Sequence, residues 1–234
     1  MRHADDAGLN EAVNEAILRL VKKSRLQSLS IIANAPATEA FCRQLPSALR
    51  EAKVEPVIFL HFNIVESAPL TDFLKPIVNS DGEFAGKWRV IQHCLTGRLG
   101  PAALETELQA QHRQLKQFGL TVAGVDSHQH MHALAPVAEA VNRFVAQHNM
   151  ITRSYGNMRC ITLVGVVKFQ MFKLLARLTQ LRHHSFPNLP RSWRRTDEPE
   201  FVVASWEKLR PQFLKTDMLV VYHPGSDYDH GLKF

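Results

Sequence analysis

Histidine and carboxylate side chains are concentrated at a few points of this chain, most densely in the run 126–132 (DSHQHMH). The run follows the apolar segment 120–125, which reads as a β-strand. In an extended segment, residues two apart share a face, and the members of the run that would then point together are Asp126, His128, His130 and His132. Imidazole suits zinc and other borderline metals, and carboxylate suits harder ions. The run predicts a metal site, with a polar loop that caps the next helix as the alternative.

Other residues that could bind a metal ion or transfer a proton also lie where a predicted strand ends and a loop begins. His61 and Asn63 end one apolar run, His223 follows another, and Asp5 and Asp6 precede the first predicted helix. Taken singly, each has a structural explanation, such as a core histidine or a helix-capping acid. In a parallel α/β fold, however, the carboxyl ends of the strands open on one face, where active sites form. The set therefore predicts one shared site.

The elements that must position these residues alternate between strand and helix. Such alternation indicates βα units, a parallel sheet and a single α/β domain over residues 1–234. The segment 69–86 carries turn signals and is predicted to be a loop. Helices are predicted at 11–23, 38–53, 101–118, 136–148, 164–182 and around 204–209, and strands at 29–33, 56–64, 120–125, 150–153 and 218–222.

Composition excludes several classes of protein. Apolar residues make up 45% of the 234 residues and charged residues 21%, as in an ordinary globular protein. The three cysteines, Cys42, Cys94 and Cys160, form no CxxC pair, which argues against a disulfide framework and a thiolate zinc site. No secretory signal is recognisable, and the most apolar stretch, 161–181, is interrupted by basic residues. These features favour the cytoplasm.

Positive charge is concentrated in the segment 151–196, which has nine Lys and Arg residues and no Asp or Glu. Since the whole chain carries +6, the remainder is net negative. The asymmetry indicates a surface that meets something anionic, such as a membrane face or a phosphorylated carrier. The predicted helix 164–182 interleaves apolar and basic residues, as an interfacial helix does. The alternative is that its apolar face packs on the rest of the fold.

Five short segments, taken together, resemble a known family. They are 4–9 (ADDAGL), 13–15 (VNE), 60–63 (LHFN), 126–130 (DSHQH) and 223–225 (HPG). In this order they resemble the YdjC-like carbohydrate deacetylases, which include the chitooligosaccharide deacetylases and relatives linked to hopanoid lipid biosynthesis. The resemblance implies an irregular (β/α) TIM-like barrel of the polysaccharide-deacetylase type. It also implies one divalent metal ion, Mg²⁺ or Zn²⁺, held by an aspartate and two histidines.

Carried onto this sequence, the resemblance assigns a role to each candidate residue. Asp6, His61 and His128 would be the metal ligands, Asp5 the general base and His223 the general acid. The residues expected to bind substrate or to support the ligands are Asn63, Asp126, His130 and Arg153. Which histidine of the 126–132 run ligates the metal is left open.

The sequence departs from the family pattern near both ends. The first barrel strand normally precedes the acidic pair, yet only residues 1–4 stand before Asp5, so that strand is expected to be nearly absent. Ala7 stands where the family commonly has an aromatic residue. The chain also stops ten residues after Pro224, where relatives usually continue through a last helix.

The expected activity is metal-dependent removal of an N-acetyl group from an amino sugar, as an oligosaccharide or a lipid-linked glycan. The protein would work in the cytoplasm or on the cytoplasmic face of an anionic membrane, and a homodimer is left open. A barrel phosphodiesterase or isomerase could use the same ligands. A nonenzymatic protein that binds anionic polymers is a further alternative, but the basic segment has few aromatic residues and no nucleic-acid module, so no nucleic acid partner is expected.

Overall fold

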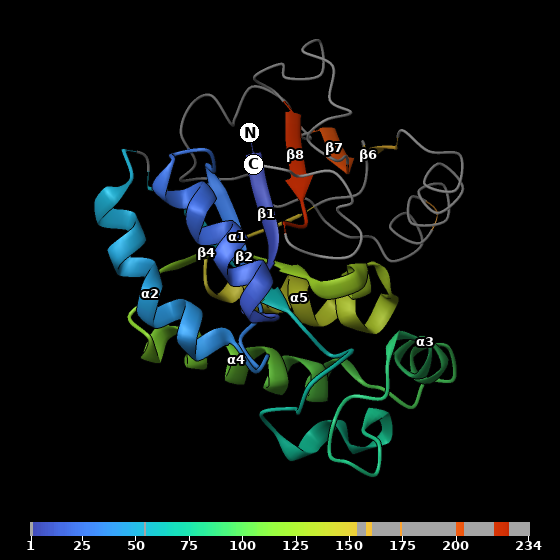
Figure 1. Cartoon of the computed structure of the whole chain (residues 1–234). Coiled ribbons are helices and arrows are strands. Elements are labelled where there is room, and N and C mark those ends of the chain that lie inside the picture. Colours follow the sequence, from blue (N-terminus) through green and yellow to red (C-terminus); the bar gives the residue numbers. More distant parts are fainter. Residues whose placement is uncertain are drawn as a thin grey trace.

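The structure is a computed structural model that describes residues 2–53, 55–153, 158–160, 174, 200–203 and 218–224. Its strands all belong to one sheet, in which every neighbouring pair is parallel and the order is β5-β4-β3-β2-β1-β8-β7-β6 (Figure 1). The strands are β1 (Arg2–Ala7), β2 (Ser28–Ile31), β3 (Val57–Phe62), β4 (Val122–Ser127), β5 (Ile151–Thr152), β6 (Met158–Cys160), β7 (Glu200–Val203) and β8 (Met218–Tyr222).

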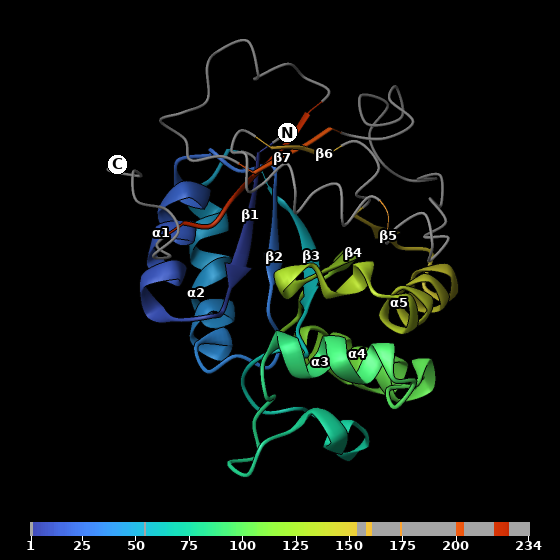
Figure 2. The ribbon, with the colours of Figure 1, turned by 90° about the vertical axis from the view of Figure 1, so that its right-hand side faces the viewer.

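Helices connect the parallel strands, because a parallel pair requires a crossover connection. The helices α1 and α2 pack on each other beside β1, and α4 and α5 pack on each other against β3 and β4 (Figure 2). The helical elements are α1 (Glu11–Lys22), α2 (Thr38–Glu51), the 3₁₀ helix η1 (Asp72–Ile77), α3 (Lys87–Leu95), α4 (Pro101–Gln117), the 3₁₀ helix η2 (His128–Ala133) and α5 (Ala135–Gln147).

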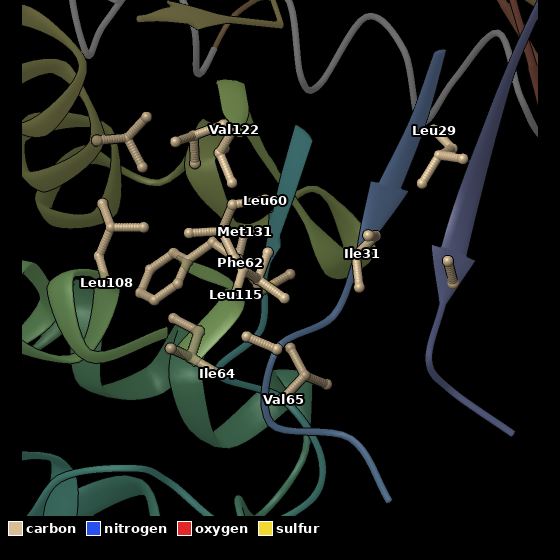
Figure 3. Packing of buried hydrophobic residues seen from close by; sticks show 14 of the residues in the cluster. Leu29, Ile31, Leu60, Phe62, Ile64, Val65, Leu108, Leu115, Val122 and Met131 are labelled. Atoms are coloured by element: carbon tan, nitrogen blue, oxygen red, sulfur yellow. The ribbon is translucent and has the colours of Figure 1, made fainter. Parts of the chain in front are cut away.

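The core fills the space between the sheet and these helices. Leu60 and Phe62 of β3 belong to one buried cluster with Leu108 and Leu115 of α4 and with Met131 of η2 (Figure 3). Strands covered by helices are buried along their whole length, so they read as continuous apolar runs. This is why β3 was recognisable in the sequence.

Most of the predicted elements are confirmed to within a few residues. The predicted helix 11–23 is α1, whose N-cap Asn10 accepts a hydrogen bond from the Val13 N–H through its side chain at 2.9 Å. The predicted strand 56–64 is β3, and the predicted strand 218–222 is β8. The helices predicted at 164–182 and around 204–209 lie outside the described residues, except that Leu174 is helical.

One predicted element is wrong, and three elements were not predicted. The segment predicted as a loop at 69–86 contains η1, and the helix α3 follows it unpredicted. Only Val90 and His93 are buried in α3, and the apolar residues Trp88 and Leu95 are exposed, so its apolar residues do not form one buried face. The short strands β6 and β7 were also missed.

The first strand, which was expected to be nearly absent, is complete. β1 contains both Asp5 and Asp6 and is hydrogen-bonded between β2 and β8. Its residues from His3 to Ala7 are buried although four of the six residues of the strand are polar. A polar strand in the middle of a sheet gives no apolar pattern, which explains the wrong expectation.

The two edge strands of the sheet are β5 and β6, and no pairing between them is described. The described residues thus establish an α/β fold with one sheet of parallel strands. They do not establish that this sheet closes into a barrel. Within the same residues, no helix has both the length and the apolar character needed to span a bilayer.

The turn after β1 depends on Gly8. Its φ of +93° is disfavoured for residues with a side chain, and a Cβ there would lie 2.5 Å from Thr38 Oγ1 and 2.9 Å from the Ile32 carbonyl oxygen. We expect Gly8→Ala to lower the free energy of unfolding by about 1–3 kcal/mol through overpacking, as measured by urea denaturation. Gly82→Ala is the control, because Gly82 shares a positive φ but has open space around it. Equal losses in the two variants would contradict the packing argument.

Candidate functional site

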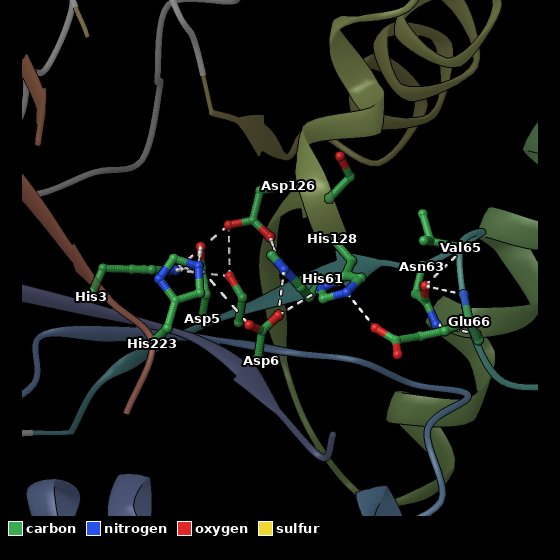
Figure 4. A network of polar contacts seen from close by, with 12 residues as sticks. His3, Asp5, Asp6, His61, Asn63, Val65, Glu66, Asp126, His128 and His223 are labelled. Atoms are coloured by element: carbon green, nitrogen blue, oxygen red, sulfur yellow. Dashed lines mark hydrogen bonds and ion pairs between the residues drawn. The ribbon is translucent and has the colours of Figure 1, made fainter. Parts of the chain in front are cut away.

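The ends of strands β1, β3 and β4 and the start of a 3₁₀ helix converge on one polar cluster (Figure 4). Asp5 and Asp6 come from β1, His61 from β3 and Asp126 from β4, and His128 begins η2. These residues are between 0% and 7% exposed. The sequence therefore correctly predicted that the segments share a site.

Asp6 lies at the centre of the predicted metal ligands. Its Oδ1 is 2.7 Å from His128 Nδ1 and 3.1 Å from His61 Nε2. One potential ligand atom from each of the three residues lies within 4.8 Å of the others. Asp6 also has a φ of +67°, which is uncommon for a residue other than glycine and is typical of functional sites.

His61 is oriented by a carboxylate on its other nitrogen. His61 Nδ1 donates to Asp126 Oδ1 at 2.6 Å, which turns Nε2 toward Asp6. Burial opposes protonation of His61, but the negative charges of Asp126 and Asp5 and the hydrogen bonds to Asp126 and Asp6 outweigh it and raise the His61 pKa to about 10. A positive charge between His61 and Asp6, from a proton or from a metal cation, is therefore stabilised by the surrounding carboxylates.

The donor set fits a divalent metal ion. One carboxylate with two imidazoles suits zinc or another transition ion and leaves coordination positions for water and substrate. His128 Nδ1 faces Asp6 at 2.7 Å, and its Nε2 lies 2.5 Å from Glu66 Oε1.

A second group of possible ligands, His3, Asp5 and Asp126, lies beside the first. Arg153 occupies it with its guanidinium, which binds Asp5 through two hydrogen bonds of 2.9 and 2.7 Å and also pairs with Asp126. Burial raises the pKa of both carboxyl groups, but the Arg153 charge outweighs it and holds both pKa values well below the ordinary range. Arg153 therefore supplies the positive charge here, and this group has no need of a metal ion.

His3 links the two carboxylates that Arg153 binds. Its Nε2 lies 2.9 Å from Ser30 Oγ and 2.9 Å from Asp5 Oδ1. Ser30 Oγ donates its single proton to Asp126 Oδ2 at 2.6 Å, so it accepts from His3 Nε2–H. His3 Nδ1 lies 2.6 Å from Ser28 Oγ. The sequence reasoning missed His3, although its position two residues before Asp5 on a strand places both on one face.

The prediction that the run 126–132 stays extended is wrong. β4 ends at Ser127, and Gln129 and His130 adopt left-handed φ values of 50° and 63°, which turn the chain into η2. His132 turns toward Ser127 Oγ and the Arg153 carbonyl oxygen. Among the described residues, the group of converging ligand atoms contains His128 and neither His130 nor His132.

Asn63 was expected to bind substrate or to support the ligands. Its Oδ1 accepts from the backbone N–H groups of Val65 and Glu66, and its Nδ2 donates to Asn34 Oδ1 and to the Glu66 carbonyl oxygen. These four bonds use the whole capacity of an amide side chain, and Asn63 is 0% exposed. Asn63 thus fixes the turn after β3 and has no bond left for a substrate.

The remaining candidates differ in their exposure. His223 follows β8, and its side chain is 26% exposed, with Nε2 3.7 Å from Asp5 Oδ2 and 3.9 Å from Asp6 Oδ2. Ala7 is fully buried in the core cluster. Arg153 was counted in the basic segment, yet its side chain is buried. It therefore adds nothing to a positive surface.

Comparisons with known proteins relate the chain to a family and to several named relatives. The model of the family described as YdjC-like protein matches residues 2–233. A carbohydrate deacetylase of Geobacillus stearothermophilus is 31% identical over 153 residues, which cover 64% of this chain and 57% of that protein. A carbohydrate deacetylase of Clostridium beijerinckii is 23% identical, covering 95% of this chain and 80% of that protein. A chitooligosaccharide deacetylase of Klebsiella pneumoniae is 27% identical, covering 64% and 57%.

A solved structure from Enterococcus faecalis shares the fold. That protein is provisionally described as a cellobiose-phosphate cleavage protein, and it superposes with a TM-score of 0.59 at 16% identity, covering 77% of this chain and 63% of that one. The match to the Geobacillus and Klebsiella deacetylases likewise spans less than two thirds of their length.

Burial of His132 makes the fold sensitive to acid. Burial lowers the His132 pKa to about 3, so between pH 6.5 and 3 the unfolded chain binds a proton here that the folded chain does not. The free energy of unfolding should therefore fall as the pH falls from 6.5 to 4.5, by at most about 1.4 kcal/mol per pH unit from this group. Urea denaturation measures this slope. We expect His132→Gln to reduce it, whereas an unchanged slope in that variant would contradict the assignment.

Proposed function

The chain belongs to the YdjC-like protein family, and on that premise we propose that it is a metal-dependent hydrolase that removes the acetyl group from an N-acetylated amino sugar. The observation that carries the proposal is the convergence of Asp6, His61 and His128 beside a second buried carboxylate, Asp5. The deacetylase names of the relatives support the reaction type. We also propose that the sheet closes into an irregular (β/α) barrel within a single domain over residues 1–234.

Asp6, His61 and His128 would hold the metal ion, with zinc favoured over magnesium by the two nitrogen ligands. A divalent ion bound there polarises the acetyl carbonyl and lowers the pKa of a bound water. The chain itself contributes the orientation of the ligands, because Asp126 fixes His61 through Nδ1.

Asp5 and His223 would handle the protons of the reaction. Arg153 keeps Asp5 ionised, so the carboxylate can accept the proton of the attacking water. Because a low pKa makes Asp5 a weak base, His223, 3.7 Å away, would take up that proton and give it to the departing sugar amine. His223 is the more exposed of the two, which suits a group that meets the leaving part of the substrate.

The substrate would be a soluble chito-oligosaccharide or a lipid-linked amino sugar, the second in accord with the hopanoid-associated relatives and the basic segment 151–196. Peripheral contact with an anionic membrane, a cytoplasmic location and homodimer formation remain parts of this proposal. A released acetate is the common product in every case.

Acetate release tests the proposed reaction. Chelator-treated protein reloaded with Zn²⁺ or Mg²⁺ is incubated with N-acetylated chito-oligosaccharides and with a lipid-linked N-acetylated sugar, and acetate is quantified. We expect release that depends on the added ion. No release from any substrate by folded, metal-loaded protein would overturn the proposal.

Asp5→Asn separates proton transfer from metal binding. The substitution removes the proposed base but none of the proposed ligands, so we expect kcat to fall by about 10²- to 10⁴-fold while metal affinity, measured by calorimetry, stays within a few-fold of the wild type. Asp72→Asn is the matched control, since Asp72 is exposed on η1, and it should leave both quantities unchanged. If kcat of Asp5→Asn equals that of the wild type, Asp5 is not the base of the reaction.

A further inference from the structure

Glu66 reaches the candidate site although no sequence pattern indicated it. Its Oε1 lies 2.5 Å from His128 Nε2, and Figure 4 shows the side chain directed at that ring. The Glu66 side chain is 44% exposed, whereas those of Asp6 and His128 are 8% and 9% exposed. Glu66 is thus a carboxylate at the solvent side of an otherwise buried centre.

The turn after β3 holds Glu66 in this position. Asn63 binds both the N–H and the carbonyl oxygen of Glu66, at 3.3 and 2.7 Å, and is itself fixed by Gln111 of α4 through two backbone hydrogen bonds of 3.1 and 2.7 Å. The N–H of Gly86 donates to the Val65 carbonyl oxygen at 3.0 Å. The backbone of Glu66 is therefore anchored, so the approach of its side chain to His128 is built into the turn.

The contacts of Glu66 complete a chain of alternating carboxylates and imidazoles. Asp126 binds Nδ1 of His61, whose Nε2 faces Asp6. On the other side, Asp6 binds Nδ1 of His128, whose Nε2 faces Glu66. Each of the two histidines thus has Asp6 on one nitrogen and a separate carboxylate on the other.

We propose that Glu66 is the positioning residue of His128, as Asp126 is of His61. A carboxylate beside the outer nitrogen of a ligand histidine favours the tautomer with the proton there, leaves the other nitrogen as the ligand and strengthens metal binding. Glu66 would thereby place the proton of His128 on Nε2 and direct Nδ1 to the metal ion. The inference rests on the proposed metal site.

The geometry also indicates how large the effect should be. Glu66 Oε1 lies 2.5 Å from His128 Nε2, but the Glu66 side chain is 44% exposed. Solvent screens a half-exposed carboxylate more than a buried one. The loss of Glu66 should therefore cost less metal affinity than the loss of Asp126, which is 0% exposed.

Metal titration of the full chain tests the proposal without any substrate. Zn²⁺ affinity is measured by competition with a chromophoric chelator for the wild type, Glu66→Gln, Glu66→Asp and Asp126→Asn. We expect Glu66→Gln to weaken binding about tenfold and Asp126→Asn up to about 100-fold, with Glu66→Asp closer to the wild type because it keeps the charge. Glu83→Gln removes the same charge from an exposed position of the neighbouring loop and should bind as the wild type does.

Nitrogen-15 NMR of the zinc-loaded protein gives a second readout, with the His128 signals assigned by their loss in His128→Gln. The proposal expects metal at Nδ1 and a proton at Nε2. Unchanged affinity in Glu66→Gln, or metal at Nε2, would overturn it even if the wild type binds zinc and releases acetate. A wild type that binds no divalent ion would instead overturn the proposed metal centre, and this inference with it.

Discussion

The structure of the site depends on the burial of three carboxylates, those of Asp5, Asp6 and Asp126, whose side chains are at most 8% exposed. A buried carboxylate is strongly destabilising unless it is paired and hydrogen-bonded. Arg153 satisfies Asp5 and Asp126, and its guanidinium shape allows two parallel bonds to Asp5. Among the described residues, the ion-pair partners of Asp6 are imidazoles, which need a proton or a metal ion to provide the matching charge.

The three carboxylates thus belong to two neighbouring groups of residues with different positive partners. On one side, Arg153, His3 and Ser30 form a permanently satisfied polar cluster that holds Asp5 and Asp126 in place. On the other, His61 and His128 contact Asp6, and the three residues together could hold an exchangeable cation. Asp126 contacts both Arg153 and His61. Arg153 therefore holds Asp126 in place, and Asp126 in turn orients His61 in the candidate metal site.

The sequence predicted the parts of this arrangement that depend on local pattern. Apolar runs such as β3 identified the parallel strands, and the polar residues at their ends identified Asp6, His61 and His128 as neighbours. It could not reveal β1 as a full strand, because its residues are polar and become buried only through tertiary pairing. The fold of 126–132 was equally inaccessible, because the left-handed turn at Gln129 and His130 has no glycine to indicate it.

Long-range contacts account for the other omissions. Arg153 lies 148 residues from Asp5, and Glu66 reaches His128 only because Asn63 turns the chain after β3. The resemblance to the YdjC-like family, which the match over residues 2–233 confirms, named the proposed ligands and Asp126, which orients His61, but neither His3 nor Glu66.

The most direct test of this account is a titration of chelator-treated protein with Zn²⁺ in which bound ion and acetate release from an N-acetylated chito-oligosaccharide are measured in the same samples. The account predicts one ion per chain, acetate release that rises in proportion to bound ion, and loss of both when Asp6 is replaced by alanine. Full acetate release from protein without a bound ion, or ion binding that survives Asp6→Ala unchanged, would contradict it.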